Sequence, residues 1–327
     1  MKAIVQDEYG APERVLELRE TEKPVPHGDE VLVRVRAASV NAQDWHIARG
    51  LPYFTRLVGA GLGFGLRGPR RRIRGDDLAG TVEAVGPEVT QFRPGDEIYG
   101  RSVGSFAEYT CAPEGTLAPK PANLTFEQAA AVPLAANTAL QGLRDRGRVQ
   151  PGQKVLINGA GGGVGTFAVQ IAKSFGAGVT GVCSTGKVEL VRSLGADRVI
   201  DYTREDFTRS GQRYDLLFDL VANRSLSDCR RALTPEGTLV LSGGGGGRWV
   251  GPLGLLLAAL VTSPFVRQRL VSLQQARSKE NLIVLKELIE AGHVRPVVDR
   301  TYPLGEVARA VEYLESGQAR GKVVIAV

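Results

Sequence analysis

A glycine cluster between two apolar runs limits the possible folds more than any other part of the sequence. It lies in the stretch VLINGAGGGVGTFAVQIAK (residues 155–173), where five of the seven residues from Gly159 to Gly165 are glycine. Because glycine weakens regular structure, such a cluster indicates a backbone that needs positive φ or that another group approaches closely. The run before it is typical of a strand and the run after it of a helix. The sequence thus predicts a tight strand–turn–helix unit.

Strand-like and helix-like segments alternate strictly from this unit onwards. Buried apolar strands separated by helices indicate a parallel sheet that is covered on both faces. Further along, residues 269–276 are a candidate sixth strand and residues 279–292 a further helix. The predicted strands are 154–159, 178–184, 197–202, 214–221 and 237–244, and the predicted helices are 166–176, 187–195 and 225–233.

The first third of the chain has a different, β-rich pattern. Short segments such as VLVRVRAASV (31–40) alternate apolar and polar residues between Gly and Pro, which predicts a small, irregular barrel or sandwich. Residues 41–50 are predicted to form a short helical insertion. The pattern changes near residue 124, and it predicts a helix over residues 124–143 with Thr125 as its N-cap. The C-terminal tail reads as strand, helix, strand.

Length and composition restrict the class of protein. A chain of 327 residues, 43% hydrophobic and 23% charged, is long enough for two globular domains. The net charge of +6 suits anionic small ligands and is also compatible with weak binding to nucleic acid. The most basic stretch, Arg67 to Gly75, lacks interleaved aromatic residues, so we interpret it as a solvated loop and expect no nucleic-acid partner.

Neither disulfides nor a membrane span are expected. Cys111, Cys183 and Cys229 are odd in number and far apart, without a CxxC pair, which indicates neither a disulfide framework nor a cysteine-rich zinc site. The N-terminus lacks the apolar core of a signal peptide. The apolar stretch Gly251 to Val266 is interrupted by Gly and Pro and is shorter than the ~18 residues that a spanning helix needs. We read it as a loop and expect a cytoplasmic protein.

The glycine cluster has the spacing of a dinucleotide-binding turn. It follows a strand and opens a helix inside a strand–helix–strand unit, and it reads A-x-G-x-x-G through Ala160, Gly162 and Gly165. In such a turn the middle glycine lets a pyrophosphate approach the backbone and the last lets the helix pack on its strand. The free amides that open the helix, at Gly163 and Val164, would hold the phosphates. The alternative is a merely tight turn.

The end of the second strand of this sheet bears on the choice of dinucleotide. A cofactor without a 2′-phosphate usually meets an acid there, about 20 residues downstream of the glycines. The sequence instead has Ser184, Thr185 and Lys187, and its first carboxylate is Glu189. Two hydroxyls and an ammonium suit a phosphate better than a ribose hydroxyl, so NADPH is favoured over NADH. Alternatively, Lys187 is simply an exposed residue in the first turn of a helix.

Over nearly its whole length the chain resembles the medium-chain dehydrogenase/reductase family, and more narrowly its zinc-independent quinone oxidoreductase branch. The resemblance implies an α/β protein with a GroES-like, β-rich catalytic domain and an inserted Rossmann domain that is a doubly wound parallel sheet, with the active site in the cleft. We expect the catalytic domain to span residues 1–123, completed by 291–327, and the NADP(H)-binding domain to span 124–290. The segments that carry the resemblance are SVNAQDWHIARG, GDDLAGTVEAVG, RPGDEIYG, GSFAEYT, AGGGVG, LGADRVIDY, YDLLFDLV and GKVVIAV.

The resemblance also bears on metal binding. Zinc-dependent members carry a cysteine at the position of Asn41, a His-Glu pair at the positions of Asp76 and Asp77, and a four-cysteine loop. This chain has none of those ligands, so we predict no metal. Asp76 and Asp77 are interpreted as a solvated or capping pair, with a hard-cation site as the alternative.

The resemblance implies roles for individual residues. Asn41 resembles the family's substrate-orienting amide, Asp44 ties its loop together or takes part in catalysis, and Tyr53 lies near the family's substrate-facing tyrosine. Thr138 resembles the threonine that supports the nicotinamide, and Tyr202 the tyrosine that flanks the adenosine phosphate. The predicted cofactor-binding residues are Thr138, Ala160, Gly162, Gly163, Val164, Gly165, Ser184, Thr185, Lys187 and Tyr202.

Two positions depart from the family pattern. Ala222 and Asn223 replace a glycine pair, which we expect to alter how the nicotinamide half is held. Arg74 replaces a common proline, which predicts a looser loop.

The predicted activity is hydride transfer from NADPH to a small molecule, either a quinone or an α,β-unsaturated carbonyl, by a homodimer. The alternatives are an NADPH-binding structural or regulatory protein with little turnover, and an alcohol dehydrogenase-type enzyme.

Overall fold

The computed structural model describes residues 1–58, 63–243 and 253–327. The chain forms two compact units. The first comprises Met1–Asn137, Arg277–Gly292 and Pro296–Val327, and the second comprises Thr138–Ala276 and His293–Arg295. This division assigns residues 124–137 and 277–290 to the first unit and residues 293–295 to the second, unlike the sequence-based limits at 123/124 and 290/291, and those domain limits stay a prediction.

The second unit is built on a six-stranded parallel sheet, as the alternating pattern predicted. Its strand order is β10-β9-β8-β11-β12-β13, and every neighbouring pair is parallel. Numbered along the chain this is the order 3-2-1-4-5-6 of a doubly wound Rossmann sheet, with its switch point between β8 and β11. The strands are β8 (Lys154–Asn158), β9 (Gly178–Cys183), β10 (Arg198–Asp201), β11 (Tyr214–Asp219), β12 (Leu233–Leu241) and β13 (Arg269–Ser272).

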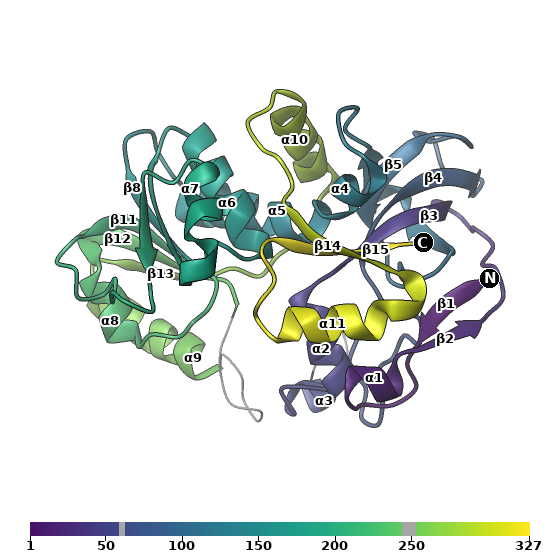
Figure 1. The fold of residues 1–327 in the computed structure, drawn as a ribbon, viewed down its shortest axis with the longest axis horizontal. Helices are drawn as coiled ribbons and strands as arrows, with labels where there is room; N and C mark the ends of the chain where they lie inside the picture. The colour runs from purple at the N-terminus through teal and green to yellow at the C-terminus, as the bar shows by residue number, and fades with distance from the viewer. Residues whose placement is uncertain (59–62, 244–252) are drawn as a thin grey trace. The chain divides into compact units, whose positions relative to one another are not determined.

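Helices cover both faces of this sheet (Figure 1). The helices α6 and α7 connect β8, β9 and β10 on one side of the switch point, and α8 and α9 connect β11, β12 and β13 on the other. Because the crossovers of parallel strands are right-handed, helices on opposite sides of the switch point lie on opposite faces. The helices are α6 (Gly163–Ser174), α7 (Val188–Ser193), α8 (Leu226–Arg231) and α9 (Leu253–Thr262).

The apolar stretch that we read as a loop is in fact mostly helical. Helix α9 spans Leu253–Thr262, and Ser263–Phe265 add a 3₁₀ turn. Leu and Ala are strong helix formers and Pro264 then ends the helix, so these propensities prevail over the Gly and Pro that interrupt the stretch. Gly251 and Pro252 of this stretch, and Gly244 of the predicted strand 237–244, lie outside the described residues.

The first unit contains a seven-stranded sheet whose longest strand, β3, pairs with three others. Strand β3 is antiparallel to β4, β6 and β15, while β14 joins β15 in parallel. The strands β1 (Lys2–Val5) and β2 (Glu17–Glu20) form a separate antiparallel pair. The strands of the large sheet are β3 (Glu30–Val40), β4 (Asp77–Val85), β5 (Glu97–Arg101), β6 (Tyr109–Pro113), β7 (Leu117–Pro119), β14 (Val298–Pro303) and β15 (Lys322–Ala326).

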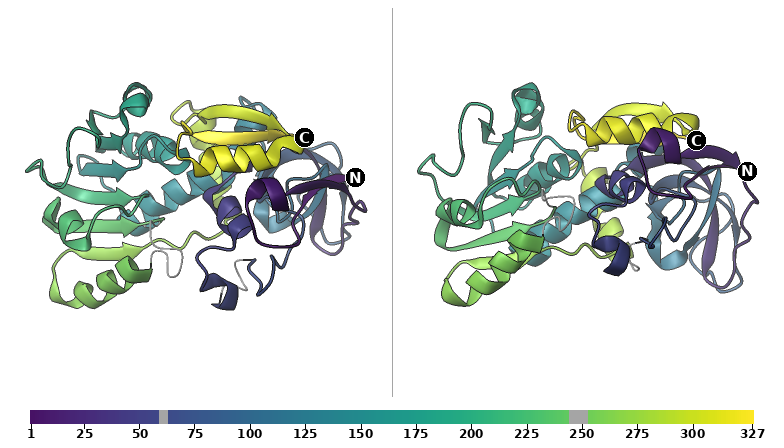
Figure 2. Two further views of the ribbon diagram at one scale, coloured as in Figure 1. Left: turned by 60° about the horizontal axis from the view of Figure 1, so that its bottom comes forward. Right: turned by 90° about the horizontal axis from the view of Figure 1, so that it is seen from below.

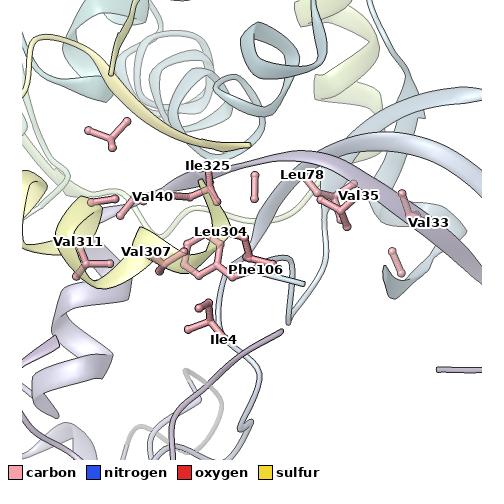
Figure 3. Close-up of a cluster of buried hydrophobic side chains, with 14 of the residues drawn as sticks. Ile4, Val33, Val35, Val40, Leu78, Phe106, Leu304, Val307, Val311 and Ile325 are labelled. Atoms are coloured by element: carbon pink, nitrogen blue, oxygen red, sulfur yellow. The ribbon is translucent and has the colours of Figure 1, made fainter. Parts of the chain in front are cut away.

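Helix α11 (Val307–Glu315) lies beside β14 and β15 and against the short helices α1 (Pro12–Val15) and α2 (Ala42–Arg49) (Figure 2). Its buried residues Val307 and Val311, one turn apart, meet Ile4, Phe106 and Ile325 in the core (Figure 3). Burying each such side chain contributes about 1.5–3 kcal/mol relative to exposure. The N- and C-terminal segments of the chain therefore share one hydrophobic core. The other helices of this unit include α3 (Thr55–Val58) and α10 (Lys279–Glu290).

The helix predicted over residues 124–143 is divided into shorter elements. Helix α4 (Phe126–Ala130) ends before Val132, α5 (Pro133–Leu140) begins at the proline, and a π-helical stretch follows over Gln141–Gly147. A residue before proline avoids the helical region, which explains the break. The predicted N-cap at Thr125 is confirmed: its hydroxyl accepts the Gln128 N–H at 3.3 Å, and the Gln128 side chain accepts the Thr125 N–H at 3.1 Å.

Candidate functional site

The turn from β8 to α6 has the geometry of an anion site. Gly159 follows the strand with a φ of +92°, and Gly162 is the N-cap of α6. The N–H groups of Gly159 and Ala160 donate to the Val182 carbonyl of β9, which ties the turn to the neighbouring strand. The first amides of a helix have no partner within it, so those of Gly163, Val164 and Gly165 have no acceptor inside α6, as an anion site requires.

Two positions of this turn are occupied by glycine for different reasons. A Cβ on Gly165 would lie 2.1 Å from the Gly159 carbonyl oxygen, so only glycine lets α6 pack this closely. A Cβ on Gly162 would have the Gly159 oxygen at 3.5 Å as its nearest neighbour, which is an ordinary contact. None of the residues that the structure describes therefore demands glycine at position 162. The space beside it suits a ligand that approaches the backbone, and the turn fits a dinucleotide pyrophosphate.

The structure brings the predicted phosphate-side residues near this turn. A Cβ on Gly161 would lie 2.8 Å from the Cβ and Cδ of Lys187, so the lysine stem runs beside the glycines. Ser184 precedes a 3₁₀ turn over Thr185–Lys187. Tyr202 is half exposed, and its N–H donates to the Cys183 carbonyl at 3.0 Å.

Sequence reasoning missed an acid at this end of the sheet. Asp201 ends β10 and pairs in register with Cys183, the last residue of β9. Its carboxylate accepts the Thr185 hydroxyl at 2.5 Å and the Thr203 hydroxyl at 2.7 Å, and these bonds lower its pKa. A search restricted to the second strand could not find it, because the third strand supplies it.

A second polar group that sequence reasoning missed lies at the switch point. Asp219 ends β11, and its Oδ1 accepts from Asn158 Nδ2 at 2.9 Å and from the Ala222 N–H at 2.9 Å. Its Oδ2 is buried without a hydrogen-bond partner among the described residues. The sequence contained a signal for this group, because Asn158 and Asp219 are polar residues that each directly end an apolar strand.

The two residues that replace the family's glycine pair have different consequences. Ala222 has a φ of +54°, a left-handed conformation that glycine adopts more easily. Asn223 uses its amide oxygen to accept from Asn158 at 3.1 Å. Thr138, the predicted nicotinamide support, is buried in α5.

In the first unit, Asn41 and Asp44 open helix α2. Asn41 is the N-cap, and Asp44 Oδ2 accepts its main-chain N–H at 2.8 Å. The carboxyl is buried, which raises the pKa of Asp44 to about 6 although the charge of Arg74 opposes this. Tyr53 lies in the turn that follows α2, where its ring faces the Arg56 guanidinium at 4.8 Å from the ring centre.

The Asn41 side chain is held by Asp77 and Lys322. Its Nδ2 donates to Asp77 Oδ2 at 3.0 Å and to the Ser39 carbonyl at 3.4 Å, and its Oδ1 accepts from Lys322 Nζ at 2.6 Å. Asp77 is 0% and Lys322 3% exposed. Burial raises the pKa of Asp77 and lowers that of Lys322, and the two opposite charges, 3.6 Å apart, counteract both shifts.

Asp76 is engaged by two arginines. Its Oδ2 accepts from Arg101 Nε at 2.9 Å, and its Oδ1 accepts from Arg277 at 2.8 Å. The reading of Asp76 and Asp77 as solvated is therefore wrong, because both carboxylates are buried and paired with cations. Its alternative of a capping role holds for Asp77, whose Oδ1 accepts the N–H of Leu134 in the first turn of α5 at 3.0 Å.

The expectation of a looser loop at Arg74 is also wrong. Its N–H donates to the Ile4 carbonyl at 3.0 Å, and its own carbonyl accepts the Phe106 N–H at 2.9 Å. A proline at this position would lack that donor, so arginine ties the segment more firmly.

The donor set does not fit a zinc ion. Within residues 1–58, 63–243 and 253–327, no three His, Cys, Asp or Glu residues gather so that they could hold a metal. The three cysteines are unpaired, and burial raises the pKa of Cys111 and Cys183 to about 11 and that of Cys229 to about 12, so their thiols stay protonated near neutral pH. Zinc sites in proteins are built from thiolate, imidazole and carboxylate ligands at a common centre, and the described residues gather no such set.

None of the helices in the described part of the chain combines the length and the apolar character that crossing a membrane requires.

Comparison with known proteins adds the family. Residues 27–122 match the alcohol dehydrogenase GroES-like domain, and residues 194–325 match the family described as zinc-binding dehydrogenase. The chain is 36% identical to the 2-methylene-furan-3-one reductase of Solanum lycopersicum and 37% identical to the chloroplastic NADPH-dependent alkenal/one oxidoreductase of Arabidopsis thaliana, each over 99% of this chain and 79% of the relative.

A solved structure agrees with these relatives. The quinone oxidoreductase of Coxiella burnetii is 30% identical, with a TM-score of 0.86 over 100% of this chain and 99% of that one. The resemblance inferred from the motifs is confirmed. The chain belongs to the medium-chain dehydrogenase/reductase superfamily, in its quinone oxidoreductase-like branch.

Proposed function

We propose that the protein is an oxidoreductase that uses NADPH to reduce a conjugated small molecule, either a quinone or an α,β-unsaturated carbonyl. The observation that carries the proposal is the turn from β8 to α6, where Gly162 leaves space beside helix-opening amides. The relatives support both acceptor classes, since one is named for alkenals and enones and another for quinones.

The residues of this chain bind and orient the reactants. NADPH, when bound, supplies the hydride. A conjugated acceptor is already electron-poor, so it needs no metal ion to polarise its carbonyl. We propose Tyr53 as the hydrogen-bond donor to the developing oxyanion. The Nδ2 of Asn41 donates to Asp77 and Ser39, which supports a role in shaping the site, and Asp44 holds the loop by capping α2.

NADPH is the cofactor that we propose over NADH. Lys187 beside Gly161 offers a positive charge near the turn, and the carboxylate of Asp201 is occupied by Thr185 and Thr203 rather than presented to a ribose hydroxyl. The charge of Lys187 therefore favours the 2′-phosphate.

Replacing Lys187 by Glu tests this preference. We expect the Kd for NADPH to rise about 10- to 100-fold, the loss of one charge-assisted hydrogen bond, while the Kd for NADH changes less than about threefold. Calorimetry with both nucleotides measures the difference, and Lys187→Arg is the matched control that keeps the charge. Equal losses for the two nucleotides would remove the argument for a phosphate site.

Activity is tested by following NADPH absorbance with ortho- and para-quinones, enones and alkenals, and with simple alcohols in the presence of NADP⁺ in place of NADPH. Consumption with a quinone or an enone supports the proposal. Tight NADPH binding without consumption across the panel indicates a structural or regulatory module instead. Alcohol oxidation together with one equivalent of zinc by elemental analysis indicates an alcohol dehydrogenase.

We also propose that the protein is a homodimer in the cytosol. Four large apolar side chains on and after α9 are exposed, namely Leu257, Leu260, Val261 and Phe265, and they lie near β13, the edge strand of the sheet. Such a patch beside an unpaired edge is typical of an interface. The unpaired cysteines suit a reducing compartment.

A further inference from the structure

A buried lysine stands among the side chains whose counterparts bind zinc in zinc-dependent members of the family. Gly321 turns the chain with a φ of +91°, and a Cβ there would lie 2.5 Å from the Val297 carbonyl oxygen. Strand β15 then pairs with the end of β3, with Val323 opposite Val40, so Lys322 is delivered beside Asn41.

Three oxygens of different kinds converge on the Lys322 ammonium. They are the Asn41 amide Oδ1 at 2.6 Å, the Val40 main-chain carbonyl at 3.1 Å and the Asp77 carboxylate Oδ2 at 3.6 Å. The ammonium is compact and has three donors, so it can serve all three oxygens. Side chain and partners are almost fully buried, so this charge does not exchange with solvent cations.

The same contacts fix the orientation of the Asn41 amide. Because Oδ1 faces an ammonium, Nδ2 must face the other way, toward Asp77 Oδ2. Asp77 is itself held by the Ser39 hydroxyl at 3.0 Å on Oδ2 and by the Leu134 N–H at 3.0 Å on Oδ1. The ammonium thus reinforces the orientation that the two acceptors of Nδ2 also favour, and without it Oδ1 would lose its donor and the carboxylate would face less opposing charge.

We propose that Lys322 is the resident cation of this site: its ammonium takes the place of a metal ion, holds Asn41 in one orientation and keeps divalent cations out. The family description that matches residues 194–325, which include Lys322, names a zinc-binding dehydrogenase, whereas the atoms that surround the Lys322 ammonium are the oxygens of Val40, Asn41 and Asp77. Oxygen ligands suit a hard cation rather than zinc. Lys322 is thus a positioning residue for the proposed reductase reaction, and only this positioning role rests on the proposed function.

Metal binding tests the proposal without any assay of activity. Lys322→Ala removes the ammonium and leaves the three oxygens facing a vacancy, so we expect the full-length variant to bind one equivalent of Mn²⁺ that the wild type does not bind. Paramagnetic resonance of free Mn²⁺ measures the binding. The matched control, Lys322→Ala with Asp77→Asn, is expected to lose it. If the variant folds only when Mn²⁺ is added, circular dichroism will report the same binding.

Either of two results would overturn this part: a Lys322→Ala chain, folded or unfolded, that binds no more Mn²⁺ than wild type, or a wild type that already binds Mn²⁺ at a site lost in Asp77→Asn.

A second experiment tests the positioning role. Lys322→Met with Asp77→Asn removes both charges, so no buried charge is left unpaired. We expect kcat to fall at least about tenfold while the Kd for NADPH stays unchanged, and we expect Asn41→Ala to produce a similar fall that does not add to it. Wild-type kcat in the double variant would refute the positioning role. If the wild type reduces none of the acceptors, the proposed function fails and the Mn²⁺ experiment still decides the nature of the site.

Discussion

At the scale of single residues, substitutions at Gly162 and Gly165 should have different effects, the first on ligand binding and the second on packing. Gly162→Ala should remove NADPH binding, because its methyl group occupies the space beside the amides that we propose to bind phosphate. Among the described residues its nearest atom is the Gly159 oxygen at 3.5 Å. As an N-cap replacement it should cost no more than about 1 kcal/mol of stability. Calorimetry with NADPH and thermal unfolding measure the two effects.

Gly165→Ala is the contrasting control. Its methyl group would lie 2.1 Å from the Gly159 oxygen, so we expect a loss of about 1–3 kcal/mol in the free energy of unfolding. If Gly162→Ala keeps wild-type affinity for NADPH, the turn has been assigned incorrectly.

The buried carboxyl of Asp44 should make stability depend on pH. Burial raises its pKa to about 6 from an ordinary value of 3.8, so between these values the folded state binds more protons than the unfolded state. Stability from this group is therefore present below about pH 4 and is lost as pH rises through 6. Relative to wild type, Asp44→Asn should gain up to about 3 kcal/mol between pH 4 and pH 7, at 1.36 kcal/mol per pKa unit. Urea unfolding across this range measures the gain.

Asp7 provides a control of opposite sign. Arg72 and Arg19 lower its pKa to about 2, so its contribution is present above the unfolded value and is lost as pH falls through 2. Asp7→Asn should therefore lose stability relative to wild type on going from acid to neutral pH. If the difference in free energy of unfolding between Asp44→Asn and wild type does not change with pH, then burial does not raise the pKa of Asp44.

At the scale of elements, helix boundaries follow local signals where caps are present. The Thr125 capping box was visible in the sequence, and the structure has both of its hydrogen bonds. Thr125→Ala should lower the free energy of unfolding by about 1 kcal/mol, since the Gln128 N–H loses its acceptor. Thr125→Ser, which keeps the hydroxyl, is expected to be close to wild type in the same chemical unfolding experiment. An equal loss of stability in Thr125→Ala and Thr125→Ser would mean that the methyl group of Thr125, rather than the hydrogen bond of its hydroxyl, stabilises the fold.

Other boundaries were not readable from local pattern. The break at Pro133 and the π-helical stretch 141–147 interrupt what reads as one helix, and α9 lies where the sequence suggested a loop. In α9 the Leu and Ala propensity and burial of residues such as Ala259 against the sheet decide the conformation. Propensity is a weak signal that tertiary packing strengthens or overrides.

At the scale of the whole molecule, the exposed patch of α9 predicts the assembly. Leu260→Glu places a charge among the apolar residues that we propose to be buried between two copies, so it should shift the protein from dimer to monomer. Light scattering after gel filtration measures the mass. Glu287→Lys, at an exposed position of α10 in the first unit, is the control for a change of charge alone. A wild type that is monomeric at micromolar concentration would contradict the proposed dimer.

The sequence by itself determined the class and order of most elements and the strand–turn–helix unit at the glycine cluster, because period-two and helical patterns, glycine spacing and caps are local. It also pointed to the residues of the second-strand end, such as Lys187. Only the tertiary structure decided which distant residues meet. Asp201 joins Thr185 because β10 pairs with β9, and Lys322 meets Asn41 because β15 pairs with β3. Those pairings bring together residues that are far apart along the chain, and no local pattern encodes which strands become neighbours.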